Sequence, residues 1–522
     1  MKKLMLGNEA FARGLYEAGC EVISSYPGTP STEITEYAAK YEDIYAEWAP
    51  NEKVATEVAL GASIGGKRSF CAMKHVGLNV AADPLFTAAY TGVNAGFVIG
   101  VADDPGMHSS QNEQDSRHYA MSAKVPMLEP SDSQECIDYV KAAYEMSEQF
   151  DTPVLVRMST RIAHSQSIVS TAEKEQHPLK EYQKDVAKYV MMPGYAKLKH
   201  PVVEKRMADL QAFSETSPLN QMIMGNKKIG IICAGTTYEY AREVMGDNAS
   251  YLKIGMIHPL PIKLIQDFAQ KVNKLYVIEE LDDVIETHCA KIGVKVIGKE
   301  LFGWIGEFSQ KWIAEKMLGK VNETMSFGEN VPIRPPVMCA GCPHRGIFYT
   351  LSRLKLTVFG DIGCYTLGAQ APLSAIDTTV CMGASISGLH GFNTARGEES
   401  AASSVAVIGD STFIHSGITG LIDIAYNKGI STIIILDNSI TGMTGHQQNP
   451  TTGYTIKGDP TAAVSLEKLC MAVGINRVRV VDPNHLEETM NAVKEEIAVK
   501  EPSVIITRRP CALLKYVKHK AP

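Results

Sequence analysis

Short apolar runs alternate with helix-like stretches through the first third of the chain. Cys20–Ser24, Phe97–Val101 and Pro153–Val156 have the length and composition of buried strands. Between them, Ser31–Tyr41 and Glu52–Ile64 are long enough for helices. This βαβ alternation predicts a parallel sheet covered by helices.

The same rhythm returns twice after a polar interruption. From Thr171 to Gln221 the chain is dense in Lys and Glu and lacks strand-like runs, which indicates a linker that contains helices. Ile229–Cys233 begins a second unit, and Pro332, Pro335 and Pro336 precede a third. We therefore expect an α/β protein with three doubly wound parallel-sheet domains, at residues 1–165, 228–330 and 331–522, with a linker at 166–227.

Composition excludes several classes of function. The 522 residues are 45% hydrophobic and 21% charged, enough to bury large cores, and the net charge of -7 gives no electrostatic reason to bind nucleic acid. Charged residues near the N-terminus argue against a secretory signal, and the sequence contains no run of 18 apolar residues. The 11 cysteines are scattered along the chain, which indicates reduced thiols rather than a disulfide framework. We expect a cytoplasmic protein that does not bind membranes.

The strongest chemical signal lies in the third unit. Val405–Ile408 leads into Gly409 and Asp410, and Thr432–Leu436 is followed closely by Asn438. Polar residues at the carboxyl ends of parallel strands lie where α/β sheets bind ligands, and glycine lets backbone amides approach phosphate. The pattern therefore predicts a phosphate site with a metal.

The spacing of these residues resembles the thiamine diphosphate motif, which begins Gly-Asp-Gly and ends in Asn, with Ser411 replacing the third glycine. Asp410, Asn438 and the carbonyl of Ile440 would suffice as protein ligands to Mg²⁺. Either turn alone would indicate only a turn after a strand. Together they favour the cofactor, with residues 331–522 as its diphosphate-binding domain.

Thiamine chemistry also needs a carboxylate beside the aminopyrimidine ring, to promote loss of the C2 proton. Glu52 opens an Ala- and Gly-rich helix with Gly61 nine positions later, which fits the pattern. Glu57 is the alternative, and a Glu at a helix N-terminus is also ordinary surface chemistry. Thiamine enzymes bridge their cofactor between two units, so residues 1–165 would be the pyrimidine-binding domain.

Several segments together resemble 2-oxoacid:ferredoxin oxidoreductases, and most of them the large subunit of the indolepyruvate type. They are Tyr26–Ser31, Met73–Asn79, Asp103–Gly106, Ser109–Arg117, Cys339–Arg345 and Gly360–Tyr365. The resemblance extends over almost the whole chain and makes residues 228–330 a transketolase C-terminal-like domain.

Carried over by position, the resemblance implies three groups of site residues. Catalytic residues would be Glu52, His75 and His344. Cofactor-binding residues would be Gly363, Cys364, Met382, Gly383, Gly409, Asp410, Asn438, Thr441 and Gly442. Thr29, Lys74 and Arg117 would face the 2-oxoacid.

The reaction implied is oxidative decarboxylation of an arylpyruvate with coenzyme A, giving an arylacetyl-CoA, CO₂ and reduced ferredoxin. A smaller, gamma-type β subunit would be the partner, in a dimer of heterodimers. Two alternatives remain open: a non-oxidative thiamine-dependent decarboxylase, and a non-catalytic homologue that binds no cofactor.

The resemblance also implies two [4Fe-4S] clusters, held in a C-terminal ferredoxin-like domain. The Cys-x-x-Cys-x-x-Cys runs typical of such a domain do not occur here, so we expect the chain to lack those ligands and to contain no iron. Cys339 and Cys342 are spaced like half of a zinc site, which Cys364 and Cys381 could complete. Thiols lining the cofactor pocket are the favoured interpretation.

Overall fold

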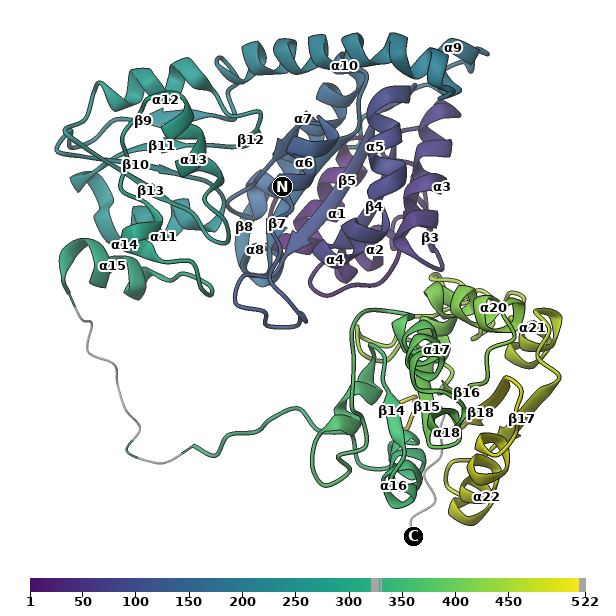
Figure 1. Ribbon diagram of the computed structural model, residues 1–522. Helices are drawn as coiled ribbons and strands as arrows, with labels where there is room; N and C mark the ends of the chain where they lie inside the picture. Colours follow the sequence, from purple (N-terminus) through teal and green to yellow (C-terminus); the bar gives the residue numbers. More distant parts are fainter. Residues whose placement is uncertain (321–327, 329–330, 516–522) are drawn as a thin grey trace. The chain divides into compact units, whose positions relative to one another are not determined.

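The computed structural model describes residues 1–320, 328 and 331–515, which form two compact units divided after Phe327 (Figure 1). The predicted domain boundary at residue 330 lies outside the described residues. Each unit is an α/β structure built on mainly parallel sheets.

The first unit contains a seven-stranded sheet in the order β12-β6-β7-β5-β4-β2-β3. All its neighbouring strands run parallel except the edge pair of β12 and β6. The strands are β2 (Val22–Ser25), β3 (Tyr45–Trp48), β4 (Ser69–Lys74), β5 (Phe97–Asp103), β6 (Met127–Leu128), β7 (Val154–Ser159) and β12 (Met256–His258). The helices are α1 (Gly7–Glu17), α2 (Thr32–Ala38), α3 (Glu52–Ile64), α4 (His75–Val80), α5 (Ala82–Thr91), α6 (Arg117–Ala123), α7 (Ser133–Phe150) and α8 (Thr160–His164).

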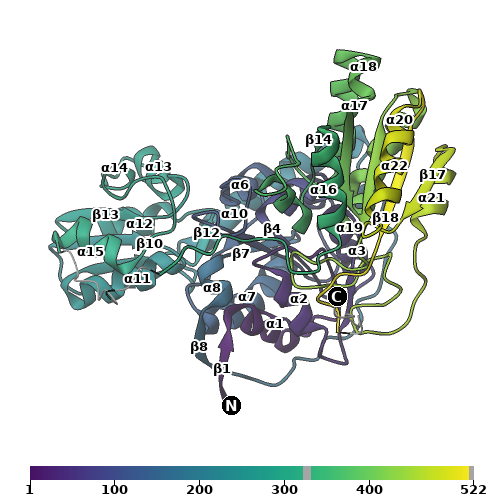
Figure 2. The same cartoon turned by 90° about the horizontal axis from the view of Figure 1, so that it is seen from below.

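A second sheet of the same unit has the order β13-β10-β11-β9, with β9 antiparallel. Figure 2 shows its strands β10 and β13. Its strands are β9 (Gln221–Ile223), β10 (Ile229–Cys233), β11 (Ser250–Lys253) and β13 (Lys274–Ile278), with helices α11 (Thr236–Met245), α12 (Ile262–Ala269), α13 (Val284–Lys291), α14 (Lys299–Phe302) and α15 (Gln310–Leu318). We call residues 221–320 without β12 the middle region. One buried apolar cluster contains Leu85 and Phe97 of the first sheet region together with Ile232 and Leu252 of the second. The two sheets therefore share a core, which explains why they form one unit.

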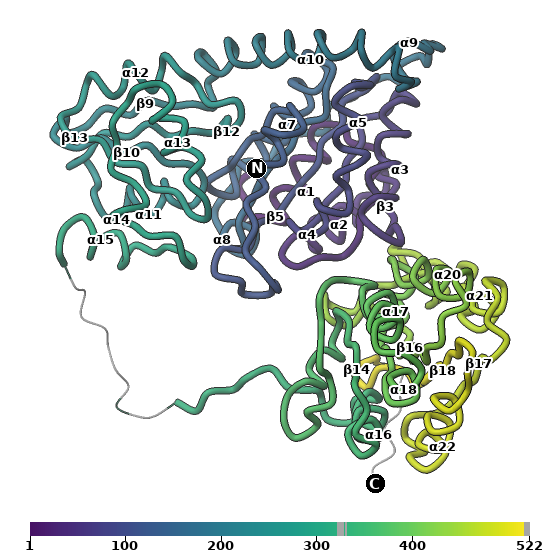
Figure 3. Tube along the Cα trace, viewed as in Figure 1, coloured from purple at the N-terminus to yellow at the C-terminus, as the bar shows by residue number. Residues whose placement is uncertain are grey.

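The predicted linker contains helices but is bounded by strands. α9 (Val186–Tyr189) and the long α10 (Pro193–Ser214) lie within it, and α10 packs against α5 (Figure 3). At its start, β8 (Gln166–Ser170) pairs with β1 (Lys2–Leu6), and at its end β9 pairs with β11. The expected strand-free stretch, Thr171–Gln221, therefore contains α9 and α10 and no strand before Gln221, where β9 begins.

The second unit is a parallel five-stranded sheet in the order β14-β15-β16-β18-β17. Its strands are β14 (Thr357–Phe359), β15 (Ser404–Gly409), β16 (Thr432–Asp437), β17 (Arg477–Val481) and β18 (Ser503–Arg508). Its helices are α16 (His344–Leu354), α17 (Ala384–Arg396), α18 (Glu398–Ala401), α19 (Asp410–Thr412), α20 (Ile418–Tyr426), α21 (Leu466–Ala472) and α22 (Leu486–Ile497). Alternate residues of β15 and β16 enter two separate buried clusters, one on each face. A sheet buried on both faces produces the continuous apolar runs seen in the sequence.

Candidate active site

The carboxyl edge of the second unit's sheet brings the predicted metal ligands together. β15 and β16 pair in parallel with Gly409 opposite Leu436, so Asp410 and Asp437 occupy the next position along the two strands. Asn438 follows directly. We call this region, with the loops that surround it, the cofactor edge.

Asp410 is suited to hold a cation. Its side chain is only 2% exposed, and Thr451 Oγ1 donates a hydrogen bond of 3.2 Å to Oδ2. Burial raises the pKa of Asp410 to about 7, and the nearby charge of Asp437 raises it further, although hydrogen bonds from Thr451 and Asn449 oppose the shift. A divalent cation would relieve both causes, so this donor set fits Mg²⁺. Thr451 and Asn449 were missed by the sequence analysis.

Asn438 is oriented by a buried histidine. Its Nδ2 donates to Nε2 of His344 over 3.4 Å, while Oδ1 accepts from the backbone N–H of Ile440 over 3.3 Å. Burial lowers the pKa of His344 to about 4, so the ring is neutral and its Nε2 can accept. Ser439 adopts the left-handed conformation with φ of 59°, which turns the chain sharply between Asn438 and Ile440. His344 thus contacts the side-chain amide of Asn438.

Close-packed glycine loops surround this edge. A Cβ on Gly442 would lie 3.4 Å from Sγ of Cys364, and a Cβ on Gly383, where φ is 86°, would lie 2.3 Å from Oγ of Ser416. The same Oγ donates to the carbonyl of Met382. A side chain at Gly383 would therefore clash with Ser416, and one at Gly442 would press against Cys364.

Two side chains fix the loops that carry the predicted cofactor residues. The buried carboxylate of Asp361 accepts from the N–H groups of Ile362 and Gly383, at 2.8 and 2.9 Å, and so joins the loop of Gly363 to the start of α17. Thr441 Oγ1 accepts a hydrogen bond of 3.3 Å from Asn449. All nine predicted cofactor-binding residues belong to these loops or strand ends.

In the first unit, Glu52 opens α3 and is buried. Asn51 caps the helix by accepting from the N–H of Val54 over 2.9 Å. A Cβ on Gly77 would lie 2.6 Å from Oε1 of Glu52, so the carboxylate lies directly against α4. Glu57 is exposed and pairs with Lys53. The geometry therefore favours Glu52 over Glu57 as the functional carboxylate.

Lys74 and His75 lie beside Gly77, beneath an exposed segment. Nζ of Lys74 donates to the carbonyl of Ser109 over 2.5 Å, and Nε2 of His75 lies 3.3 Å from the carbonyl of Asn112. Burial lowers the pKa of Lys74 to about 8 and also lowers that of His75, whose buried Nδ1 has no hydrogen-bond partner among the described residues. Oγ of Ser109 lies 3.5 Å from the carbonyl of Thr29. Thr29, Lys74 and His75 therefore form one group.

Arg117 does not belong to this group. Its side chain is 2% exposed and forms ion pairs with Asp115 at 2.5 Å and Glu279 at 2.6 Å. Its Nη2 also donates to the carbonyls of Glu280 and Asp282. Because these partners enclose the guanidinium, we reassign Arg117 from substrate contact to the junction with the middle region.

Four cysteines gather beside the cofactor edge. Burial raises the pKa of Cys364 to about 11, and the charges of Cys342, Cys511 and Cys339 raise it further. The same mutual effect acts on Cys342. Cys381 is exposed and is influenced by Asp361 instead. Cys511, rather than Cys381, thus joins the set that the sequence analysis considered.

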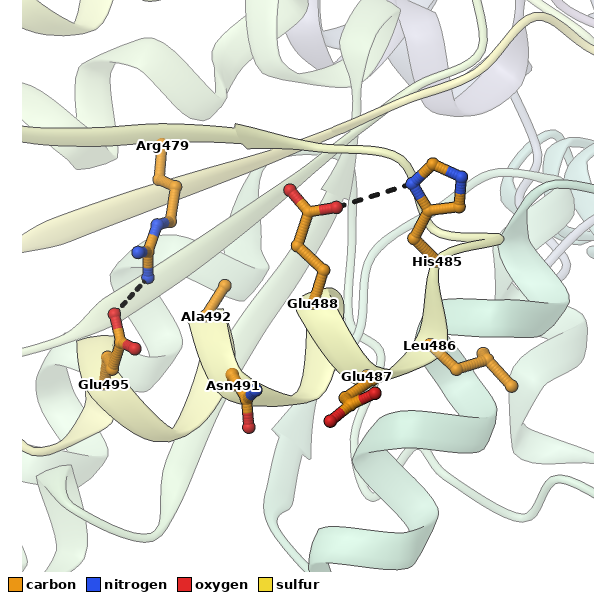
Figure 4. A pocket seen from close by; sticks show the side chains of 8 residues that line it. All are labelled: Arg479, His485, Leu486, Glu487, Glu488, Asn491, Ala492 and Glu495. Atoms are coloured by element: carbon orange, nitrogen blue, oxygen red, sulfur yellow. Dashed lines mark hydrogen bonds and ion pairs between the residues drawn. The ribbon is translucent and has the colours of Figure 1, made fainter.

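The second unit also contains a pocket of about 580 Å³ between β17 and α22 (Figure 4). It is lined by Arg479, His485, Leu486, Glu487, Glu488, Asn491, Ala492 and Glu495. Its charges pair locally, Arg479 with Glu495 at 2.5 Å and His485 with Glu488 at 3.4 Å. It contains none of the predicted site residues.

Among the described residues, no helix is both long and apolar enough to span a bilayer.

Comparisons with known proteins agree with this geometry. Residues 13–223 match the family described as pyruvate flavodoxin/ferredoxin oxidoreductase, thiamine diphosphate-binding, and residues 361–507 match the C-terminal TPP-binding domain of thiamine pyrophosphate enzymes. The chain is 38% identical to indolepyruvate oxidoreductase subunit IorA of Archaeoglobus fulgidus, over 98% of this chain and 87% of that protein. It is 40% identical to the IorA subunit of Pyrococcus horikoshii, over 98% of this chain and 86% of that protein.

A solved structure supports the fold. The 2-oxoglutarate:ferredoxin oxidoreductase of Magnetococcus marinus, determined with 2-oxoglutarate, coenzyme A and succinyl-CoA bound, aligns with a TM-score of 0.51 at 18% identity. The alignment covers 62% of this chain and 65% of that chain.

Proposed function

Because the chain belongs to the family of indolepyruvate oxidoreductase IorA subunits, thiamine-diphosphate-dependent 2-oxoacid:ferredoxin oxidoreductases, we propose that it catalyses oxidative decarboxylation of arylpyruvates. Coenzyme A would accept the acyl group and ferredoxin the electrons, with a smaller partner subunit completing the enzyme. The observation that carries the proposal is the edge formed by Asp410 and Asn438 at adjacent parallel strand ends.

The predicted site residues have the chemistry that thiamine diphosphate requires. Thiamine diphosphate, when bound, supplies a thiazolium carbon that attacks the keto carbon of the substrate. Asp410, Asn438 and the carbonyl of Ile440 would hold Mg²⁺, with the glycine loops around the diphosphate. Glu52, buried against Gly77, would exchange a proton with the aminopyrimidine ring. Lys74 would bind the substrate carboxylate, and His75 would offer its buried Nδ1 to the reacting group.

An anaerobic assay of the full chain with its smaller partner tests the activity. We expect ferredoxin reduction that requires both indolepyruvate and coenzyme A, with formation of the arylacetyl-CoA. An aldehyde formed without coenzyme A would favour the non-oxidative decarboxylase. Failure to bind thiamine diphosphate would indicate a non-catalytic homologue.

The charge of Lys74 predicts the pH dependence of substrate binding. With a pKa lowered to about 8 by burial, Lys74 is cationic below that pH and loses its charge above it. We therefore expect KM for the arylpyruvate to rise about fivefold between about pH 8 and about pH 9. In Lys74→Met, KM should be high at both values. A wild-type KM that stays constant across this range would exclude Lys74 from carboxylate binding.

The cysteine set supports a second cofactor. We propose that the neighbouring thiols of Cys339, Cys342, Cys364 and Cys511 bind an iron–sulfur cluster as thiolates, because such a cluster takes four cysteine ligands. The proposal departs from the expectation of an iron-free chain, which stays a prediction.

Anaerobic reconstitution with iron and sulfide tests the cluster. The full chain should retain about four iron atoms with a four-iron EPR signal. Cys511→Ser should lose most of that iron, whereas the control Cys381→Ser should keep it. Equal iron contents in the two variants would contradict the assignment.

A further inference from the structure

The segment from Asp104 to Ser116, exposed in its middle and buried at its ends, lies against Thr29, Lys74 and His75, the predicted substrate group. It joins β5 to α6 and contacts Lys74 through Ser109 and His75 through Asn112. We call these residues the covering segment. Residues 107–109 and 111–112 are exposed, so apart from these two contacts the position of the segment depends on the contacts at its ends.

The first end is held partly from within. Asp104 accepts from the N–H of Ser109 over 2.8 Å and from Oγ of Ser110 over 2.6 Å. Its other oxygen accepts from Thr160 of α8 over 2.7 Å. Glu113 accepts from the N–H of Gly106 over 2.7 Å, which closes the segment on itself.

Glu307 of the middle region contacts this first end of the covering segment. Its carboxylate lies 3.2 Å from Nε2 of His108 and forms a two-pronged ion pair with Arg161 of α8, at 2.8 and 2.7 Å. A Cβ on Gly106, where φ is 82°, would lie 3.2 Å from the N–H of Glu307, so the two chains approach closely. A small cavity of about 250 Å³ lies here, lined by His108, Thr160, Arg161, His164, Ser165 and Glu307.

The other end is joined to the middle region through Arg117. Asp115 binds both Nε and Nη2 of the guanidinium, while Nη1 reaches Glu279 at the end of β13. His118 lies 2.8 Å from Asp282 of the same region. Asp115 and Arg117 are fully buried, and an ion pair out of water is sensitive to the loss of either partner.

We propose that the middle region positions the covering segment over Lys74 and His75, with Arg117 and Glu307 as the two positioning residues. Neither side chain contacts Thr29, Lys74 or His75, so each acts through the backbone of the covering segment. A role of the covering segment in substrate access rests on the proposed function. The dependence of the segment's position on the middle region is independent of that function.

Hydrogen–deuterium exchange on the full chain tests the dependence. Arg117→Gln and Glu307→Gln should each raise exchange of the hydrogen-bonded amides of Gly106, Met107 and Ser109 about tenfold, while β4 and β5 stay protected. Arg68→Gln is the matched control, because Arg68 is also buried and pairs with Glu148 rather than with the segment. It should leave the segment unchanged. Should Arg117→Gln fail to fold, the partly exposed Glu307 supplies the decisive variant.

Steady-state kinetics with the partner subunit add a readout of function. A positioning role predicts that KM for the 2-oxoacid rises about tenfold in Glu307→Gln while kcat changes less than about twofold. Unchanged segment exchange in the folded variants would overturn the proposal, as would a rise spread equally over the whole unit. A rise confined to the segment with no arylpyruvate turnover in wild type would support the mechanical link and reject the proposed function instead.

Discussion

Asp410→Ala is expected to abolish Mg²⁺-dependent binding of thiamine diphosphate. Substitution removes a buried carboxylate that no other described side chain at this edge replaces directly, since Asp437 is paired with Arg508 at 2.7 Å. Losing a residue that merely supports a metal ligand typically costs about 10- to 100-fold in affinity, so loss of the ligand itself should exceed about 100-fold. Calorimetric titration of the full chain with thiamine diphosphate, with and without Mg²⁺, measures the effect.

Asp423→Ala provides the control. Asp423 is an exposed carboxylate on α20 of the same unit, and its side chain accepts a hydrogen bond from the nearby Asn427. Its removal should leave cofactor affinity within about twofold of wild type, as for most surface substitutions. Equal affinities in wild type and Asp410→Ala would remove Asp410 from the metal site.

Glu52→Gln is expected to keep the fold and the bound cofactor but to slow loss of the C2 proton. Glutamine matches glutamate in size, so it can occupy the space beside Gly77, but an amide cannot share a proton with the aminopyrimidine ring. We expect exchange at C2 to slow by about 10²- to 10⁴-fold, the usual contribution of a positioned acid–base group. Deuterium exchange followed by acid quench and NMR gives the rate.

Glu57→Gln is the matched control on the same helix. Glu57 lies five residues further along α3, is exposed, and pairs with Lys53. Its exchange rate should equal that of wild type. Slow exchange in Glu57→Gln together with normal exchange in Glu52→Gln would reverse the assignment.

The positions of residues near strand ends were predictable, because the pattern of apolar and polar residues indicates where each strand ends. Two continuous apolar runs, each ending in a polar turn, required neighbouring parallel strands, and parallel strands present their carboxyl ends at one edge. Asp410 and Asn438 therefore met as expected. Glu52 was chosen differently, from the family pattern of a Glu that opens a helix with Gly61 nine positions later, and α3 does begin at Glu52.

Contacts between distant segments were not predictable. Thr451 reaches Asp410 from an irregular loop, whose path no periodicity describes. Cys511 joins the other thiols only because β18 runs beside β16 and carries the chain back to the cofactor edge. Arg117 was expected to face the 2-oxoacid, whereas it pairs with Glu279, which follows a strand of another sheet. Sequence spacing predicts local geometry, but it does not predict which sheets pack against each other.

The short strand β12 has a practical consequence for dissecting this protein. It comes from between β11 and α12, yet it pairs with β6 and so forms the outermost strand of the first sheet. A fragment cut at residue 165 would leave Met127 and Leu128 with unpaired backbone groups on one side, beside an apolar surface that Ile232 and Leu252 normally cover. Bare edges of this kind recruit strands from other molecules. Such a truncation should therefore aggregate, and expression trials should begin from residues 1–320.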